Sequence, residues 1–317
     1  MWRWMMMVVM AVAAAGCGER GAAEREGEEN ERLRVVASIF PLGSLAERVV
    51  GEAGQVTVLL PAGRSPHAFE LTVRQVRELA DADVLVVAGG GVDPWATRAA
   101  ERFGQQVRVV DVDAVVRAAR KDASGVGSAV DEIDEMEHDH GRGAVNPHHW
   151  LDPKRAAEFV SHLGTELARD FPAHSETLLA NTKATLDTIL AVDALYRAQL
   201  RGVKRREMVA FHNAFDLLAE RYGLEVVAHL TPIELVPGGE VTPGRLEAVL
   251  ARIEEHDLEV IYAEPQFPET AVAALRERAG VAVLRLDPLG DPRREGYDSW
   301  EALMRSNLET LVEGQSR

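Results

Sequence analysis

The chain has 317 residues, about twice the length of a typical single domain, so its length predicts one large domain or two medium ones. Its composition, 46% hydrophobic and 27% charged, is typical of a globular protein with a sizeable core and excludes a wholly disordered chain. The net charge of −16 argues against a nucleic-acid-binding protein, which needs a basic surface, and mildly favours a cationic ligand. A single cysteine, Cys17, allows neither an internal disulfide nor a cysteine-based zinc cluster.

Residues 1–16 have the pattern of a secretory signal peptide: Arg3 supplies a positive charge, an uncharged run covers residues 5–15, and small residues precede Cys17. The run is too short to cross a bilayer as a helix, which needs about 20 apolar residues. Because Cys17 directly follows Ala-Ala-Gly, the segment looks like a bacterial lipoprotein processing site, and we expect lipidation at Cys17, with simple secretion as the alternative. Residues 17–32 are charged and poor in apolar groups, so we expect a solvated acidic tether.

From residue 33 onward, short apolar runs alternate with helical patterns, which predicts parallel sheets covered by helices. The expected fold class is α/β, with two lobes that each hold a mainly parallel sheet flanked by helices. We place an N-terminal lobe at 33–150, linking helices at 151–202 and a C-terminal lobe at 203–317. The helix expected over 174–201 is long enough to join the two lobes.

The expected strands and helices follow from hydrophobic periodicity and from start and stop signals. Thr72 and Gln75 form a capping-box pattern at the start of one helix. Residues 120–146, rich in Gly, Asp, Glu and His, are predicted to be a loop. The expected strands are 33–38, 55–60, 83–88, 106–110, 207–211, 224–228, 259–263 and 281–286, and the expected helices are 42–50, 72–80, 154–170, 174–201, 213–222, 243–255, 269–279 and 299–313.

Four side chains stand in loops where a ligand site is expected: His67 in GRSPHAF, His148 in NPHHWLDP, His212 in MVAFHN and Asp287 in LRLDPLG. In open α/β sheets, ligands bind outside the carboxyl ends of the strands. Three imidazoles plus one carboxylate or water form a four-coordinate site suited to Zn²⁺. The spacing predicts that these residues hold a metal between the lobes. An equal alternative is that the histidines are separate, solvated loop residues.

Other histidines are weaker candidates. Of the neighbours His148 and His149, only one can easily point into a cleft, and we choose His148 because Pro147 precedes it and Trp150 would pack below it. His138 and His140 lie in the acidic stretch DEMEHDHG, which is either a loop that holds zinc loosely and passes it on or a solvated charged loop. His229, at a strand end, is a minor candidate, and the expected surface histidines are His162, His174 and His256.

In order along the chain, these motifs resemble the periplasmic solute-binding lipoproteins of bacterial metal ABC transporters, and they look closest to the zinc-specific (ZnuA-type) members. The resemblance covers nearly the whole chain after the signal peptide. The matching segments are ASIFPL, SPHAFELT, DADVLVVAGGGVDPW, NPHHWLDP, AFHNAFDLLAERYGLE, YAEPQF and LDPLG.

The resemblance implies two α/β lobes joined by a rigid long helix, with the metal between them and His67, His148 and His212 as ligands. Asp287 matches a position where some members supply a fourth ligand and others leave it to water or a loop glutamate. Members that bind manganese place a carboxylate where His212 stands, so His212 favours zinc. The resemblance also implies a non-enzymatic, exported protein, periplasmic or lipid-anchored on the outer face of the cytoplasmic membrane, that delivers Zn²⁺ to an ABC-type permease.

Three alternatives stay open at this point. The same role could serve Mn²⁺ or another divalent metal. A secreted zinc hydrolase would need an open coordination position and a general base; Glu70, Glu234 or Glu264 could serve, but the sequence has no HExxH motif. A surface adhesion protein of the same fold would need an exposed apolar patch.

Overall fold

The computed structural model describes residues 32–103, 107–124, 146–231, 242–267 and 269–317. Internal contacts group Leu33–Arg317 into one unit, and this unit carries the whole architecture discussed below. The predicted signal peptide, the lipidation site Cys17, the acidic tether up to residue 31, and His138 and His140 lie outside the described residues, so those assignments stay predictions. Among the helices that are described, none is both long enough and apolar enough to span a bilayer.

The first sheet has four parallel strands in the order β2-β1-β3-β4. Its central strand β3 is buried at every position, as expected for a parallel strand with helices on both faces. The capping box predicted at the start of α3 is present, because Thr72 and Gln75 satisfy each other's backbone amides. The elements of this part are β1 (Leu33–Ala37), α2 (Phe40–Val50), β2 (Gly54–Val58), α3 (Val73–Ala80), β3 (Val84–Val87), α4 (Pro94–Phe103), β4 (Arg108–Asp111) and α5 (Val112–Ser124).

The second sheet repeats the same design, with four parallel strands in the order β6-β5-β7-β8. Alternate residues of β7 contribute to two different hydrophobic clusters, Tyr262 to one and Ile261 to the other, so both faces of this sheet are covered. The elements are β5 (Glu207–Ala210), α8 (Asp216–Tyr222), β6 (Glu225–His229), α9 (Pro243–Glu255), β7 (Val260–Ala263), α10 (Glu269–Ala279), β8 (Ala282–Arg285) and α11 (Trp300–Gln315).

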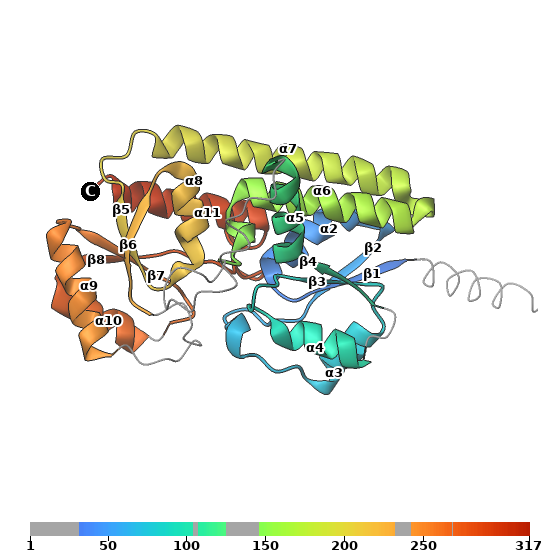
Figure 1. The fold of residues 1–317 in the computed structure, drawn as a ribbon, viewed down its shortest axis with the longest axis horizontal. Coiled ribbons are helices and arrows are strands. Elements are labelled where there is room, and N and C mark those ends of the chain that lie inside the picture. The colour runs from blue at the N-terminus through green and yellow to red at the C-terminus, as the bar shows by residue number, and fades with distance from the viewer. Residues whose placement is uncertain (1–31, 104–106, 125–145, 232–241, 268) are drawn as a thin grey trace, which may run out of the picture. The chain divides into compact units, whose positions relative to one another are not determined.

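Two long helices connect the sheets: α6 (Pro153–Asp170) and α7 (Ser175–Leu200) pack along each other (Figure 1). At 26 residues, α7 is about 39 Å long, which agrees with the long connection predicted from the sequence. Helix α11 packs against α7 and also contacts α2, so the start of this last helix reaches the first lobe. There the backbone N–H of Trp300 donates to the Ser44 hydroxyl (2.9 Å).

The predicted fold class is confirmed, but two helices differ from the sequence prediction. Neither α4 nor α5 was predicted, and the last residues of α5, 120–124, fall in a stretch that was predicted to be a loop. The segment after β4 is a good helix former, and the Asp111 carboxylate accepts a hydrogen bond from the backbone N–H of Ala114 at the helix start (3.0 Å). The helix therefore extends until the glycine-rich stretch begins. The proposed lobe boundaries at residues 150 and 203 stay predictions.

The close approach of α6 and α7 requires a glycine at position 164. A Cβ at Gly164 would lie 1.9 Å from the Thr182 hydroxyl oxygen. We therefore expect Gly164→Ala to lower the free energy of unfolding by about 1–3 kcal/mol through overpacking. Gly202→Ala is the matched control, because a Cβ there has no neighbour within 4 Å. Urea unfolding of both variants measures the difference; equal stability of the two would contradict the packing argument.

Candidate metal centre

The structure brings three imidazoles from three separate loops into one cluster. The potential ligand atoms of His67, His148 and His212 all lie within 4.8 Å of one another. The Nε2 atoms of His148 and His212 are 3.3 Å apart. That separation matches the edge of a tetrahedron with Zn–N bonds of about 2.05 Å, which is about 3.3 Å. Two of the nitrogens thus already have the spacing that a tetrahedral zinc ion requires.

His67 is positioned by a short helical turn that follows β2. The turn (Pro66–Ala68) is capped by Ser65, whose hydroxyl accepts from the His67 backbone N–H (3.3 Å). The indole N–H of Trp95 in α4 donates to the Pro66 carbonyl (2.7 Å) and so ties the turn to the first lobe. The His67 ring itself has a hydrogen bond to the backbone of Gly91.

His148 is buried and lies in the segment that leads into α6. Its Nδ1 is 2.8 Å from the Asn146 side-chain oxygen, and its ring packs on Trp150 with centroids 5.2 Å apart. The indole N–H of Trp150 donates to the Pro288 carbonyl (2.7 Å), and the Trp150 carbonyl accepts from the indole N–H of Trp300 (2.7 Å). These bonds fix the His148 segment against the second lobe.

His212 follows strand β5 and belongs to the second lobe. Its Nδ1 pairs with the Glu264 carboxylate, which comes from the end of β7 and is 2% exposed. Because Nδ1 is engaged by the carboxylate, Nε2 is the nitrogen that faces His148. A carboxylate behind a ligating imidazole orients the ring and raises its basicity, as in many zinc sites.

The three imidazoles differ in their affinity for protons. Burial, with a contribution from the nearby His212, lowers the pKa of His67 to about 4. Burial and the neighbouring histidines lower the pKa of His148 well below its usual range. Burial also disfavours charge on His212, but the attraction and hydrogen bond of Glu264, together with Asp216, outweigh it and raise the pKa of His212. His67 and His148 are therefore neutral near pH 7, the state a metal ligand needs.

The remaining predicted site residues are placed less directly. Asp287 is buried, and its Oδ1 accepts from the backbone N–H groups of Leu289 and Gly290 (both 2.9 Å). It is not a member of the three-histidine group. His149 points elsewhere, with Nε2 2.8 Å from the Asp113 carboxylate, which is consistent with the choice of His148 over its neighbour.

Two residues that contact the clustered histidines, Asn146 and Glu264, were not predicted from the sequence to support the site. Asn146 stands two positions before His148 in the NPHHW segment, and Glu264 was considered only as a base for a hydrolase. The available signal was their presence inside the segments that carry the resemblance. Nothing in the sequence indicates that Glu264 meets His212, because 52 positions separate them.

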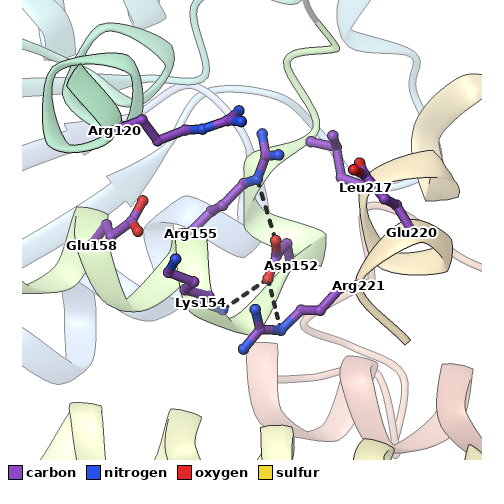
Figure 2. A pocket seen from close by; sticks show the side chains of 8 residues that line it. All are labelled: Arg120, Asp152, Lys154, Arg155, Glu158, Leu217, Glu220 and Arg221. Atoms are coloured by element: carbon purple, nitrogen blue, oxygen red, sulfur yellow. Dashed lines mark hydrogen bonds and ion pairs between the residues drawn. The ribbon is translucent and has the colours of Figure 1, made fainter. Parts of the chain in front are cut away.

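Ion pairs of Asp152 form a second connection between the N-terminal end of α6 and helix α8. A cavity of about 250 Å³ is lined by residues of α5, α6 and α8. In its wall, Asp152 interacts with Lys154, Arg155 and Arg221 (Figure 2). Asp152 caps α6 by accepting from the Lys154 backbone N–H (2.9 Å), and it pairs with Arg155 (3.2 Å) and with Arg221 of α8 (3.1 Å). Arg221 also pairs with Asp193 of α7 (2.9 Å). None of the three clustered histidines lines this cavity.

Comparison with known proteins decides the family. Residues 35–314 match the family described as "Zinc-uptake complex component A periplasmic". The chain belongs to this family. The resemblance predicted from the sequence motifs is therefore confirmed.

Several relatives of the chain bear names that refer to metal binding. It is 28% identical to the manganese-binding lipoprotein MntA of Halalkalibacterium halodurans, over 98% of this chain and 97% of that protein. It is 27% identical to the high-affinity zinc uptake system protein ZnuA of Bacillus subtilis, with the same coverage. It is also 27% identical to the zinc-binding lipoprotein AdcA of Streptococcus pneumoniae, but it spans only 57% of that protein's length.

Solved structures agree with the fold. A crystal structure of ZnuA superposes with a TM-score of 0.72 at 21% identity, covering 90% of this chain and all of that one. The periplasmic zinc-binding protein TroA of Treponema pallidum gives a TM-score of 0.77 at 18% identity, covering 90% of this chain and all of that one. At these identities the likeness supports the two-lobed architecture.

The geometry predicts that His212 is essential for metal binding. Replacing His212 by alanine removes one of three ligand nitrogens, so we expect zinc affinity to fall by more than the roughly 10–100-fold typical of lost supporting contacts. Competition titration with a chromophoric chelator measures the change. His162→Ala on the exposed side of α6 serves as control and keeps full affinity. Unchanged zinc affinity in His212→Ala would remove His212 from the site.

The raised pKa of His212 predicts a pH dependence. Protons compete with zinc at this nitrogen, so affinity falls as the pH drops through a pKa that lies above the ordinary 6.5. Glu264→Gln removes the charge that raises the pKa. The fall then moves to lower pH, and affinity near pH 8 weakens by about 10-fold as the ring loses basicity.

Apparent zinc affinity measured from about pH 8 to pH 5 distinguishes the two curves. Glu70→Gln is the matched control, because Glu70 is exposed and only three positions from His67. It should reproduce the wild-type curve. An identical pH profile in Glu264→Gln would show that the carboxylate does not govern the protonation of His212.

Proposed function

We propose that this protein captures Zn²⁺ outside the cytoplasm and delivers it to an ABC-type membrane permease. The observation that carries the proposal is the cluster of His67, His148 and His212, whose ligand atoms lie within 4.8 Å of one another. Membership of the zinc-uptake family supports it independently. The protein binds the ion and later releases it chemically unchanged. On binding, the three imidazoles replace water molecules of the ion's hydration shell.

In this proposal the three histidines supply three ligand nitrogens. Asp287 remains the proposed fourth ligand, with water as the alternative. Because its Oδ1 accepts from two backbone N–H groups, its second carboxylate oxygen would be the atom that binds the ion. His138 and His140 are proposed to hold zinc loosely before it enters the cluster. Relatives named as lipoproteins support export and a lipid anchor, which we place at Cys17.

The donor set supports zinc over manganese. Three imidazole nitrogens suit Zn²⁺, whereas Mn²⁺ favours carboxylate, carbonyl and water oxygens. Glu264, the carboxylate that contacts the cluster, pairs with His212 Nδ1. The relative named for manganese keeps Mn²⁺ as the alternative cargo.

The structure gives less support to a zinc hydrolase. A general base must stand free beside the metal. Of the glutamates considered, Glu264 is paired with His212, Glu70 is exposed, and Glu234 lies outside the described residues. We therefore propose a binding protein without catalytic activity; turnover of ester or peptide substrates by the zinc-loaded protein would contradict this.

A competition titration tests the identity of the cargo. We expect the wild-type chain to bind one Zn²⁺ and to prefer it strongly to Mn²⁺. His212→Glu replaces a nitrogen by carboxylate oxygen and should shift the zinc-to-manganese preference toward manganese by at least about 10-fold. The control is His256→Glu, outside the cluster, which should leave the preference unchanged. Absence of stoichiometric zinc binding by the wild-type chain would refute the proposal.

A further inference from the structure

The side chain of Asn146 makes contacts in both lobes at once. Its oxygen Oδ1 accepts from the backbone N–H of His148 (3.0 Å) and lies 2.8 Å from Nδ1 of the same residue. Its Nδ2 donates to the backbone carbonyl of Asn213 (2.6 Å), in the second lobe and next to His212. One amide group therefore contacts a metal ligand and the immediate neighbour of another.

The orientation of this amide is determined by groups with only one chemical role. A backbone N–H can only donate, so the group facing it must be Oδ1; a backbone carbonyl can only accept, so the group facing Asn213 must be Nδ2. With Oδ1 facing the His148 ring, Nδ1 of that ring must carry a proton. Neutral His148 then has its lone pair on Nε2, the atom that lies 3.3 Å from Nε2 of His212.

We infer that Asn146 is a positioning residue that selects the metal-binding tautomer of His148 and holds the ligand segments of the two lobes in register before the ion arrives. The inference deepens the proposed zinc capture and rests on it. An amide is the only side-chain group of this size that can both accept from His148 and donate to Asn213. Aspartate keeps the acceptor and loses the donor, and alanine loses both.

The two variants separate the two roles. In Asn146→Ala, Nδ1 of His148 has lost its acceptor, so both tautomers become populated in the metal-free protein, and we expect zinc affinity to fall by about 10–100-fold. In Asn146→Asp, the carboxylate still accepts from Nδ1, so the tautomer is kept. A carboxylate oxygen now faces the Asn213 carbonyl, however, and zinc should dissociate several-fold faster than from the wild type.

Asn181→Ala is the matched control. Asn181 also donates its Nδ2 to a backbone carbonyl, that of Val49 (3.2 Å), but this bond joins α7 to α2 away from the histidines. This variant should lose stability while keeping the wild-type tautomer of His148 and zinc affinity within about twofold. A purely structural role for Asn146 would give the same result at that position.

The experiment uses the full chain with ¹⁵N-labelled histidine. Long-range ¹H–¹⁵N spectra of the metal-free protein report the tautomer of His148, and chelator competition and stopped-flow exchange report zinc affinity and release. A single Nδ1–H tautomer together with wild-type affinity in Asn146→Ala would overturn the first role. Wild-type zinc release from Asn146→Asp would overturn the second. If the wild-type chain fails to bind zinc, the proposed function fails, while the spectra of the metal-free variants still decide the tautomer assignment.

Discussion

A neutral imidazole offers a metal ion one lone pair, and the direction of that lone pair depends on where the ring keeps its proton. The rest of this site is arranged around that constraint. Each of the three clustered rings has a different partner on its far side: the backbone at Gly91 for His67, an amide for His148 and a carboxylate for His212. The potential ligand atoms of the three rings lie within 4.8 Å of one another.

The three partners also make the rings chemically unequal. Burial disfavours the charged form of all three rings, but the Glu264 carboxylate raises the pKa of His212, whereas the pKa values of His67 and His148 are lowered. The negative charge beside the cluster is therefore found at His212, whose Nδ1 pairs with the buried Glu264 carboxylate. In the proposed zinc complex, this carboxylate partly neutralises the charge of the ion through His212.

Hydrophobic periodicity and local signals were sufficient to predict the alternation of strands and helices, the capping box at Thr72 and the long helix α7. Those features depend on residues close together in sequence. Because His67 and His212 both follow strands, the sequence could suggest that they lie close together. Their separation could not be predicted, because it depends on how the two lobes pack. The partners Asn146 and Glu264 were missed as supports for the same reason, since their contacts in the other lobe or on another strand are 67 and 52 positions away.

Local propensity also explains where the sequence prediction failed. No element was predicted over residues 112–119, and composition alone assigned residues 120–146 to a loop. Asp111 is a short-range signal that would have marked the start of helix α5. Conversely, the preference for His148 over His149 rested on neighbouring Pro147 and Trp150, and the geometry agrees with it.

The indole contacts around the crevice have a consequence for motion between the lobes. The N–H groups of Trp150 and Trp300 reach carbonyl acceptors deep between the lobes, and a wide hinge motion would leave these buried donors without partners. The turn that carries His67 is only half-buried and is tethered from its own lobe by Trp95. A wide separation of the lobes would therefore cost the free energy of these buried hydrogen bonds, whereas a shift of the turn that carries His67 would leave both of them intact.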